Sequence, residues 1–233
     1  MEKIIEEKDI GGYIGRLLRE NFGRGPGNVI CTFSHPFITV YITNFLSPVE
    51  KSLLNNQQES YVHKTRDLLM QSIIKESSSY IEQNISEHVK EFYYDWDLKN
   101  QSGIFIIILS NLSEKGLLSD QLYKNKQGVH TEIIEASKES EKPPADIASF
   151  FLNKRQLLIR REGILVNIEK ELIEQGYEEP LRLAKRKLEK RLLIQKIPQL
   201  NEYLHSCIED VFVDWDFRKD KSYICLILRP PRT

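Results

Sequence analysis

The sequence predicts an α+β fold built from two tandem repeats, each with a four-stranded sheet packed on helices. Two observations lead to this prediction. The triplet Asp-Trp-Asp occurs at residues 95–97 and again at 214–216, each time shortly before an apolar run typical of a buried strand. When the sequence is compared with itself at an offset of 119 residues, apolar positions with helical spacing also align. Alternating helical and strand patterns of this kind are typical of helices layered on a sheet.

The repeat extends without a gap over residues 37–109 in the first copy and 156–228 in the second. Eleven of these 73 aligned positions are identical, and they include the tryptophan of each triplet. The shared apolar pattern strengthens this weak identity, so we treat the two segments as one repeated unit. The predicted domains are a first repeat at 1–112, a polar linker at 113–129 and a second, diverged repeat at 130–233.

Each repeat is expected to begin with a helix that is followed by a hairpin. In the first copy the helix covers residues 4–21, where apolar residues recur on one face, and residues 131–140 take the equivalent place in the second. The predicted strands are joined by short polar turns. The strand pairs are 29–33 with 37–45 and 147–152 with 157–166.

The stretch Ser47-Pro48-Val49-Glu50 has the features of a helix start. Serine is a favoured N-cap, proline fits the first helical position, and a glutamate three residues after the N-cap closes a capping box. Pro198 predicts a break between two later helices in the second copy, and another capping box at Ser79–Glu82 predicts the same break in the first. With the helix that starts after Ser47, each repeat is expected to have two or three helices between its hairpins, and a hairpin through Asp-Trp-Asp ends it. The later helices are predicted at 58–76 and 79–90, with counterparts near 178–196 and 198–209.

The composition excludes several classes of protein. The chain has 233 residues, a net charge of −1 and three cysteines, none of them paired at the CxxC spacing of redox or zinc motifs. Its N-terminal stretch is charged, and its longest apolar run, residues 104–109, is far shorter than the ~20 residues of a membrane helix. We expect a soluble, cytoplasmic protein that is not inserted in a membrane and does not bind nucleic acid.

Gly23, Arg24, Gly25 and Gly27 form the first candidate site, in a Gly-Arg-Gly-Pro-Gly turn after the first helix. Closely spaced glycines let backbone N–H groups converge on an anion, and an arginine adds a forked donor. However, phosphate loops usually precede a helix, whereas this turn precedes a strand. Glycine followed by proline is also the ordinary way to end a helix, so the structural interpretation is favoured over anion binding.

Asp95, Asp97, Asp214 and Asp216 form the second candidate site. On a strand, the two aspartates of each triplet project to one face while the tryptophan faces the other. Four carboxylates are able to hold a hard cation or to act as an acid and a base, but no third ligand lies at a suitable spacing. We favour the tryptophans as core anchors and the aspartates as an exposed acidic face that is either solvated or in contact with a protein partner.

The basic stretch Leu181–Arg191 places Arg182, Lys185, Arg186 and Lys190 toward one helical side. Because no aromatic residues are interleaved, it is interpreted as a solvated helix face rather than a nucleic-acid site. The five histidines show no metal-ligand spacing, and none recurs at the 119-residue offset. No motif for a catalytic serine, a phosphate loop or a dinucleotide fold is found. We therefore predict no catalytic residues, no metal and no cofactor.

The first half of the chain resembles the bacterial MpsC-like family of domains. The resemblance is carried by the segments IGRLLRENFGRGPGNVICTF, FITVYITNFLSPVEKSLL, YVHKTRDLLMQSII and FYYDWD, within residues 10–110. Its more specific elements are the Gly23–Pro26 turn and the stretch Leu46–Lys51. The resemblance implies a link to a sodium-translocating, membrane-potential-generating system whose other parts are membrane proteins. In the second copy Lys142–Ala145 replaces the glycine turn, so only the first repeat keeps the pattern there.

These observations favour a non-enzymatic binding protein, an accessory of a membrane ion or solute translocation system. When surfaces that would form a symmetric dimer occur twice in one chain, they are able to pair internally, so we expect an internal pseudo-dimer that is also capable of further self-association. The alternative is a small-anion or nucleotide sensor that uses the Gly-Arg-Gly-Pro turn. A third hypothesis is an enzyme built on the aspartate pairs.

Overall fold

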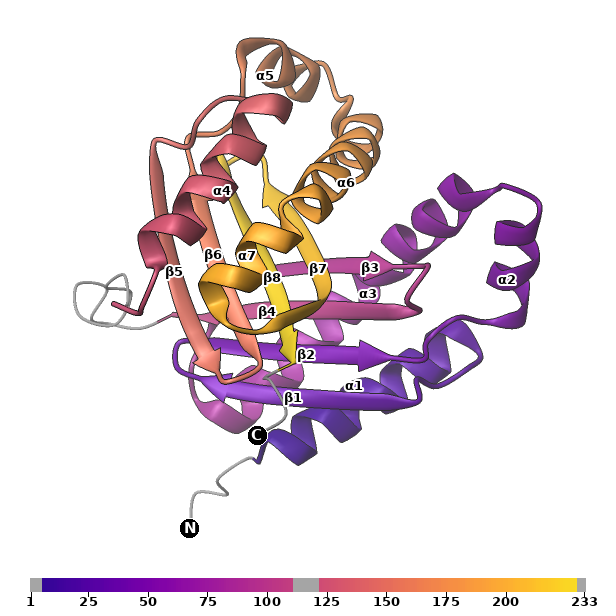
Figure 1. Cartoon of the computed structure of the whole chain (residues 1–233). Coiled ribbons are helices and arrows are strands. Elements are labelled where there is room, and N and C mark those ends of the chain that lie inside the picture. Colours follow the sequence, from indigo (N-terminus) through magenta and orange to yellow (C-terminus); the bar gives the residue numbers. More distant parts are fainter. Residues whose placement is uncertain (1–5, 111–121, 230–233) are drawn as a thin grey trace. The chain divides into compact units, whose positions relative to one another are not determined.

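The computed structural model describes residues 6–110 and 122–229, and the chain divides into two compact units, Met1–Leu117 and Leu118–Thr233. Each unit packs helices on one four-stranded antiparallel sheet, which confirms the predicted α+β class (Figure 1). The two sheets have the same strand order. In each, the first and the last hairpin of the unit lie side by side.

The first unit has one helix before its first hairpin and two helices between its hairpins. Its sheet has the order β1-β2-β4-β3, so β2 and β4 are central. α1 and α3 pack on one face of this sheet, and the apolar residues between them form the core. The elements are α1 (Glu7–Phe22), β1 (Asn28–Ser34), β2 (Phe37–Thr43), α2 (Pro48–Asn55), α3 (Glu59–Ile85), β3 (Val89–Asp97) and β4 (Ser102–Leu109).

The second unit repeats this plan with three helices between its hairpins. Its sheet has the order β5-β6-β8-β7, and α4, α6 and α7 pack on one face of it. The prediction of two or three helices between the hairpins is thus confirmed, with a different number in each unit. The elements are α4 (Lys126–Ser140), β5 (Asp146–Asn153), β6 (Gln156–Glu162), α5 (Asn167–Glu174), α6 (Glu178–Gln195), α7 (Ile197–Leu204), β7 (Cys207–Asp216) and β8 (Lys221–Arg229).

The predicted break between two helices in the first unit is wrong. α3 runs without interruption from Glu59 to Ile85, whereas the second unit breaks at Lys196, between α6 and α7. The difference lies at one aligned position, which holds Ser79 in α3 and Pro198 in α7. Proline lacks an N–H and clashes with the preceding turn, while serine keeps the hydrogen bond of the helix. A capping pattern without such a breaker therefore does not end a helix.

Some element ends differ from those predicted. α4 begins at Lys126 and so includes the end of the predicted linker, while residues 113–121 of that linker lie outside the described residues. β6 ends at Glu162 instead of residue 166, because Gly163 follows with a φ of 67°, outside the conformation of a strand.

The buried faces of α1 and α4 correspond position by position at the 119-residue offset, which extends the repeat toward the N-terminus. Among these aligned pairs only Ile14 and Ile133 are identical, because a buried helix position has to fit the core but does not require a particular residue. The buried residues are Ile10, Gly11, Ile14, Leu17 and Leu18 in α1, and Val129, His130, Ile133, Ala136 and Ser137 in α4.

Trp96 and Trp215 are core residues, as predicted, with 1% and 2% of their surface exposed. Trp96 lies opposite Gly103 in the ladder between β3 and β4. A Cβ atom on Gly103 would be 2.2 Å from the indole ring, so this glycine lets the ring lie against the backbone of β4. In the second unit the equivalent partner of Trp215 is Ser222.

We expect Gly103→Ala to lower the free energy of unfolding by about 1–3 kcal/mol, because the added methyl group overpacks against Trp96. Gly12→Ala is the matched control, since a Cβ there meets no atom within 4 Å. In the middle of a helix that change is expected to stabilise by up to about 1 kcal/mol. Urea unfolding measures both, and an unchanged midpoint for Gly103→Ala would contradict the close packing.

Candidate functional site

Glu50 is the only buried residue of the short helix α2, and it makes two kinds of contact. Its carboxylate accepts a hydrogen bond from Ser47 N at 2.7 Å, and the Ser47 hydroxyl accepts one from Glu50 N at 3.3 Å, which confirms the predicted capping box. The same carboxylate accepts hydrogen bonds from Arg66 of α3, from Nε at 2.7 Å and from Nη2 at 3.1 Å. The residue that caps α2 therefore also attaches α2 to α3.

Arg66 is fully buried among three aromatic rings. Its guanidinium carbon lies 4.5 Å from the ring centroid of Trp96, 5.1 Å from that of Phe45 and 5.6 Å from that of Phe22. Nη2 also donates to the carbonyl oxygen of Phe45 at 3.0 Å. Because the faces of aromatic rings attract a cation, this aromatic cage stabilises a charge that would be costly in an aliphatic core.

The ion pair determines the charge of Glu50. Burial by itself would raise the pKa of Glu50, but the hydrogen bond and charge of Arg66, with the hydrogen bonds of Ser47, outweigh it and lower the pKa. Glu50 is therefore ionised at neutral pH. A carboxyl whose pKa is lower in the folded state stabilises the fold above its unfolded pKa, and this contribution is lost as the pH falls through the folded pKa.

The second unit has the same ion pair at the 119-residue offset, with a lysine in place of the arginine. Glu169 is the only buried residue of α5, and its carboxylate accepts a hydrogen bond from Val166 N at 3.0 Å. Lys185 of α6 donates to Glu169 at 2.8 Å, and its Nζ lies 5.7 Å from the ring centroid of Trp215, the counterpart of Trp96. Each short helix is thus attached to the next long helix by one buried glutamate.

The surroundings of the two ion pairs differ at three aligned positions. The first unit has apolar residues there, and the second has two carboxylates and a guanidinium. One buried cation therefore faces one carboxylate around Arg66, whereas two cations face three carboxylates around Lys185. The aligned residues are Phe22, Ile42 and Met70 in the first unit and Glu141, Arg161 and Glu189 in the second.

Glu189 is the centre of the charged cluster in the second unit. It accepts hydrogen bonds from Arg161 Nη2 at 2.6 Å and from Trp215 Nε1 at 3.0 Å. Lys185 Nζ lies 3.4 Å from Glu189 and also contacts Glu141. The cluster therefore joins α6 to β6, to β7 and to the end of α4.

Arg161 is held by hydroxyl groups as well as by the carboxylate. Its Nε donates to Ser222 at 3.0 Å, and its Nη1 donates to Ser137 at 2.8 Å. Ser222 is the counterpart of Gly103, so the position that makes room for an indole ring in the first unit supplies an acceptor in the second. Burial would lower the pKa of Arg161, but the charges of Glu189 and Glu141 outweigh it and raise the pKa.

The interpretation of residues 181–191 as a solvated helix face is wrong for Lys185 and Arg186, which are 5% and 3% exposed. Charge alone suggested solvent exposure, because unpaired basic side chains are seldom buried. The sequence did hold a signal against solvent exposure at Lys185, because the 119-residue offset aligns it with another basic residue, Arg66.

The four predicted aspartates do not form one exposed face. Asp95 and Asp214 are 0% and 4% exposed, whereas Asp97 and Asp216 are partly exposed. Asp95 accepts a hydrogen bond from the next backbone N–H at 2.8 Å, and Asp214 pairs with Arg182. Asp97 and Asp216 accept hydrogen bonds from backbone N–H groups of the turns that follow them. The predicted exposure is therefore wrong for two of the four, and contact with a partner stays a prediction.

The Gly-Arg-Gly-Pro-Gly turn ends α1. Gly23 is the C-cap with a φ of 68°, a left-handed conformation that glycine adopts without strain. The side chain of Arg19 lies against Gly25, where a Cβ would be 2.8 Å from Nε. The C-terminus is the negative end of a helix dipole and does not by itself favour an anion. Anion binding by Gly23, Arg24, Gly25 and Gly27 stays a prediction.

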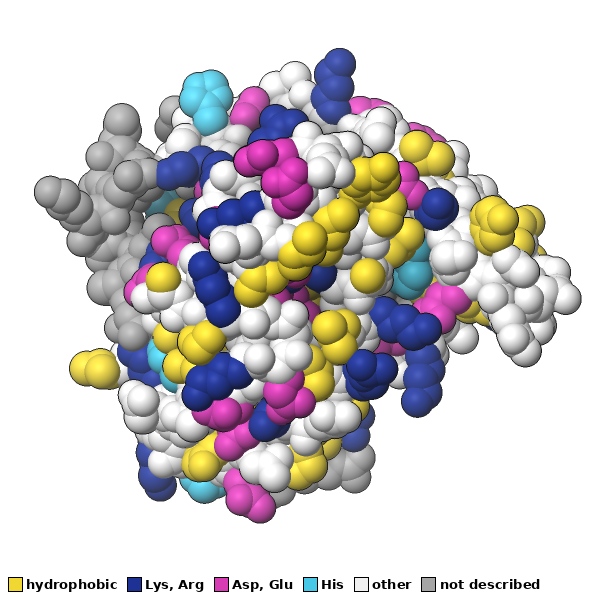
Figure 2. Space-filling view, turned by 90° about the horizontal axis from the view of Figure 1, so that it is seen from above, with side chains coloured by type: hydrophobic (Ala, Val, Ile, Leu, Met, Phe, Trp, Pro, Cys, Tyr) yellow, Lys and Arg dark blue, Asp and Glu magenta, His cyan; other side chains and the backbone are white. Residues whose placement is uncertain are grey.

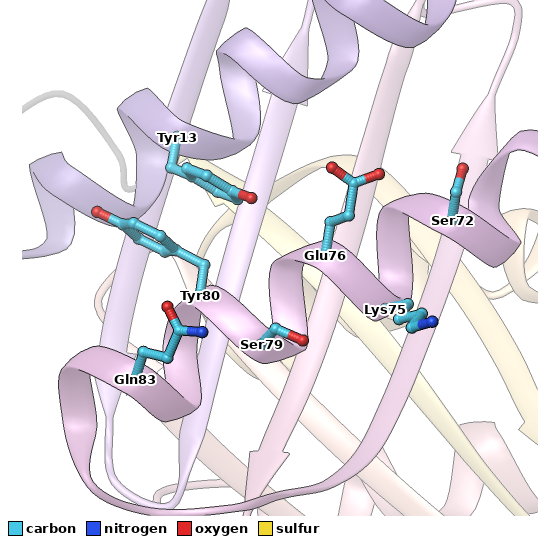
Figure 3. Close-up of a pocket in the computed structure, with 7 residues that line it drawn as sticks. All are labelled: Tyr13, Ser72, Lys75, Glu76, Ser79, Tyr80 and Gln83. Atoms are coloured by element: carbon cyan, nitrogen blue, oxygen red, sulfur yellow. The ribbon is translucent and has the colours of Figure 1, made fainter.

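A groove of about 550 Å³ lies between α1 and α3 in the first unit (Figure 3). Tyr13 and Tyr80 stack there with their ring centroids 3.8 Å apart, and the Tyr13 hydroxyl points toward Glu76. Burial, together with the charge of Glu76, raises the pKa of Tyr13. At the 119-residue offset Glu132 and Gln199 replace the two tyrosines, so the second unit lacks this stack. The groove is lined by Tyr13, Ser72, Lys75, Glu76, Ser79, Tyr80 and Gln83.

The surface offers no metal centre within the described residues, where no group of three or more His, Cys, Asp or Glu side chains is placed to hold an ion. Within residues 6–110 and 122–229, no helix is long and apolar enough to cross a bilayer. On the face drawn in Figure 2, basic and acidic side chains are interspersed. A face of mixed sign differs from the continuous basic surface typical of nucleic-acid binding.

Residues 3–111 match the model of a protein family described as Na+-translocating membrane potential-generating system (MpsC). This range includes every described residue of the first unit, 6–110, and it confirms the resemblance found in the sequence. Comparisons with curated proteins and with solved structures give no match.

We expect Arg66→Met to lower the free energy of unfolding by about 3–5 kcal/mol, because it leaves the charge of Glu50 buried without its partner. Adding Glu50→Gln to this variant removes the unpaired charge and should restore a large part of the loss. Lys75→Met, at an exposed position on the same helix, is the control and should change stability by at most about 0.5 kcal/mol. Urea unfolding at neutral pH measures all three, and an Arg66→Met variant as stable as the control would contradict the role of the ion pair.

Proposed function

Because residues 3–111 match the model of the MpsC family, we propose that the chain is a non-enzymatic accessory protein that binds a component of a membrane ion or solute translocation system. The family description supports the link to a membrane-potential-generating system. In this proposal the protein acts in the cytoplasm, as a component that is not itself inserted in the membrane. The observation that carries a binding role is a pair of exposed apolar side chains at equivalent positions of the two short helices.

Val49 on α2 and Ile168 on α5 are aligned at the 119-residue offset and are 70% and 66% exposed. Single exposed apolar residues are ordinary, but these two take the same place in copies that share few residues. The helix that follows each also starts with an exposed tyrosine. Tyr61 in α3 is 59% exposed, and Tyr177 at the N-cap of α6 is 51% exposed. Large apolar and aromatic side chains are the usual anchors of protein interfaces.

The buried ion pairs fix these apolar side chains in position. Val49 directly precedes Glu50, and Ile168 directly precedes Glu169. Each exposed anchor is therefore next to the residue that attaches its short helix to the long one. A contact surface that is already ordered loses less conformational entropy on binding, which supports the use of α2 and α5 as docking elements.

We infer that the second unit is a diverged copy of the MpsC-like domain. The same order of hairpins and helices, the same strand order and the ion pair at aligned positions support this.

In each sheet, the apolar residues that alternate with the core residues support the predicted internal pseudo-dimer. Alternate residues of the central strands β4 and β8 belong to the core under the helices of their own unit. The residues between them are also mainly apolar, and an apolar sheet face is stable only when another surface covers it. These residues are Ile104, Ile106 and Ile108 in β4 and Tyr223, Cys225 and Ile227 in β8.

The combined variant Val49→Asp with Ile168→Asp is expected to weaken binding to membrane vesicles of the source organism at least about tenfold, because two interface anchors are lost. Cosedimentation of the purified full chain with the vesicles measures the affinity.

The matched control is Leu68→Asp with Ile194→Asp, at positions on the long helices that are 66% and 52% exposed. These substitutions add the same charge and should leave binding unchanged. An equal loss in both pairs, or no loss in the first, would overturn the docking role of the short helices.

A fragment of residues 1–112 is expected to self-associate or to unfold, because it exposes the apolar face that the pseudo-dimer would cover. Sedimentation velocity and circular dichroism measure its association and folding. A fragment that is folded and stays monomeric at high concentration would contradict the pseudo-dimer.

A further inference from the structure

The cluster around Lys185 in the second unit contains more acid than base. The carboxylates of Glu141, Glu169 and Glu189 all lie within ion-pair distance of this one ammonium group. Arg161, on β6, is the second cation of the cluster and pairs with Glu189. Uncompensated charge is costly in a buried site, and a carboxyl group in that position takes up a proton.

Glu141 has the geometry of the carboxyl that holds this proton. Its side chain is 0% exposed, and its Oε2 atom is buried without a hydrogen-bond donor in the described part of the chain. The carboxyl groups of Glu141 and Glu189 both lie against the ammonium group of Lys185, so the two groups are close together. Two ionised carboxylates repel each other at such a distance, whereas one proton between them makes a hydrogen bond.

Glu189 is the partner that stays ionised. It receives hydrogen bonds from Arg161 and Trp215 and lies 3.4 Å from Lys185. Lys185 also contacts Glu141, which favours ionised Glu141, but the ammonium group is shared with two other carboxylates. Burial, followed by the charge of Glu189, therefore dominates and raises the pKa of Glu141 to about 9. Burial also opposes ionisation of Glu189, but the charges of Arg161 and Lys185 outweigh it and lower its pKa to about 2.

We propose that Glu141 and Glu189 form a proton-binding site that fastens the C-terminal end of α4 to α6, and that loss of this proton at alkaline pH releases α4. Glu141 is the C-cap residue of α4, so its side chain links that end of the helix to α6, beside the hydrogen bond that joins Ser137 to Arg161 of β6. Ionisation would place two adjacent negative charges there, and the C-terminal end of a helix dipole is itself negative. The charged neighbours from the other packed elements are Glu169 on α5, Lys185 on α6 and Arg161 on β6.

The direction in which stability changes with pH follows from the proton that Glu141 holds in the native state. The native state keeps it up to about pH 9, whereas an unfolded glutamate loses it near its ordinary pKa of 4.5. Between these values the native state binds more protons than the unfolded state, so stability falls as the pH rises. Glu189 is shifted in the opposite direction, and its contribution is lost as the pH falls from 4.5 toward 2.

The first unit is an internal control for the proton-binding site of Glu141 and Glu189. Phe22 and Met70 take the places of Glu141 and Glu189, and Arg66 is balanced by Glu50 alone. No carboxyl of that ion pair is expected to titrate at alkaline pH. The indole N–H of Trp215 donates to Glu189, so its NMR signal reports on the charged cluster of the second unit. Trp96 takes the equivalent position beside Arg66, so its signal reports on the ion pair of the first unit.

The test is a titration of the full chain by ¹H–¹⁵N NMR from about pH 6 to about pH 10, following both indole signals. Trp215 is expected to shift with a midpoint within about a unit of 9, while Trp96 stays constant. The protection factors of residues 133–146 against hydrogen exchange, taken relative to the intrinsic exchange rate at each pH, should fall about tenfold or more across the same transition. Glu141→Gln, which is neutral and of the same shape, is expected to abolish both changes and to stabilise the fold at about pH 6, because the wild-type glutamate must take up a proton on folding whereas glutamine need not.

Several results would overturn the proposal. They are a Trp215 signal that does not titrate, a midpoint that is the same in Glu141→Gln, or protection factors of α4 that are independent of pH. If Glu141→Gln does not fold, a ¹³C carboxyl titration of the wild-type chain decides the question. One glutamate with a midpoint above about pH 7 supports the site, and midpoints that all lie below about pH 6 reject it.

Discussion

Both units depend on a buried ion pair between a short helix and the long helix that follows it. α2 and α5 each bury a single residue, and their apolar side chains that pack on the core are only partly buried. The glutamate that closes the capping box also binds Arg66 or Lys185, which combines the start of one helix with its attachment to the next. A buried ion pair is not by itself strongly stabilising, but leaving either charge alone is costly, so the arrangement has few alternatives. The buried ion pair therefore fixes the position of each short helix.

The two units stabilise the buried cation of the long helix in different ways. In the first, an arginine is enclosed by aromatic rings, and one carboxylate balances its charge. In the second, three apolar positions have become charged, and a lysine, an arginine and three glutamates form one cluster. Each solution is consistent with a packed core, because the aromatic cage supplies a favourable surface for a cation and the cluster pairs most of its charges. Only the second leaves a surplus carboxyl, that of Glu141, whose pKa is raised to about 9.

Much of the architecture could be predicted from local patterns. The hairpins, the capping box at Ser47 and the core tryptophans follow from strand alternation, helix-start residues and the 119-residue repeat. The candidate sites were predicted less well. Asp95 and Lys185 were assigned to solvent because of their charge, yet both are buried. Nothing in the spacing of Tyr13 and Tyr80 predicts that they stack, because they lie on separate helices.

By itself, the sequence determined the class of fold, the correspondence of the two halves at the 119-residue offset, the four hairpins and the resemblance of the first half to its family. These depend on periodicity and on short signals, which act between residues close in the chain. Tertiary structure decided which charges are buried, because burial and pairing bring together residues far apart in sequence, such as Glu141, Arg161 and Glu189. It also decided that α3 is continuous, since a capping pattern ends a helix only where the backbone is prevented from continuing.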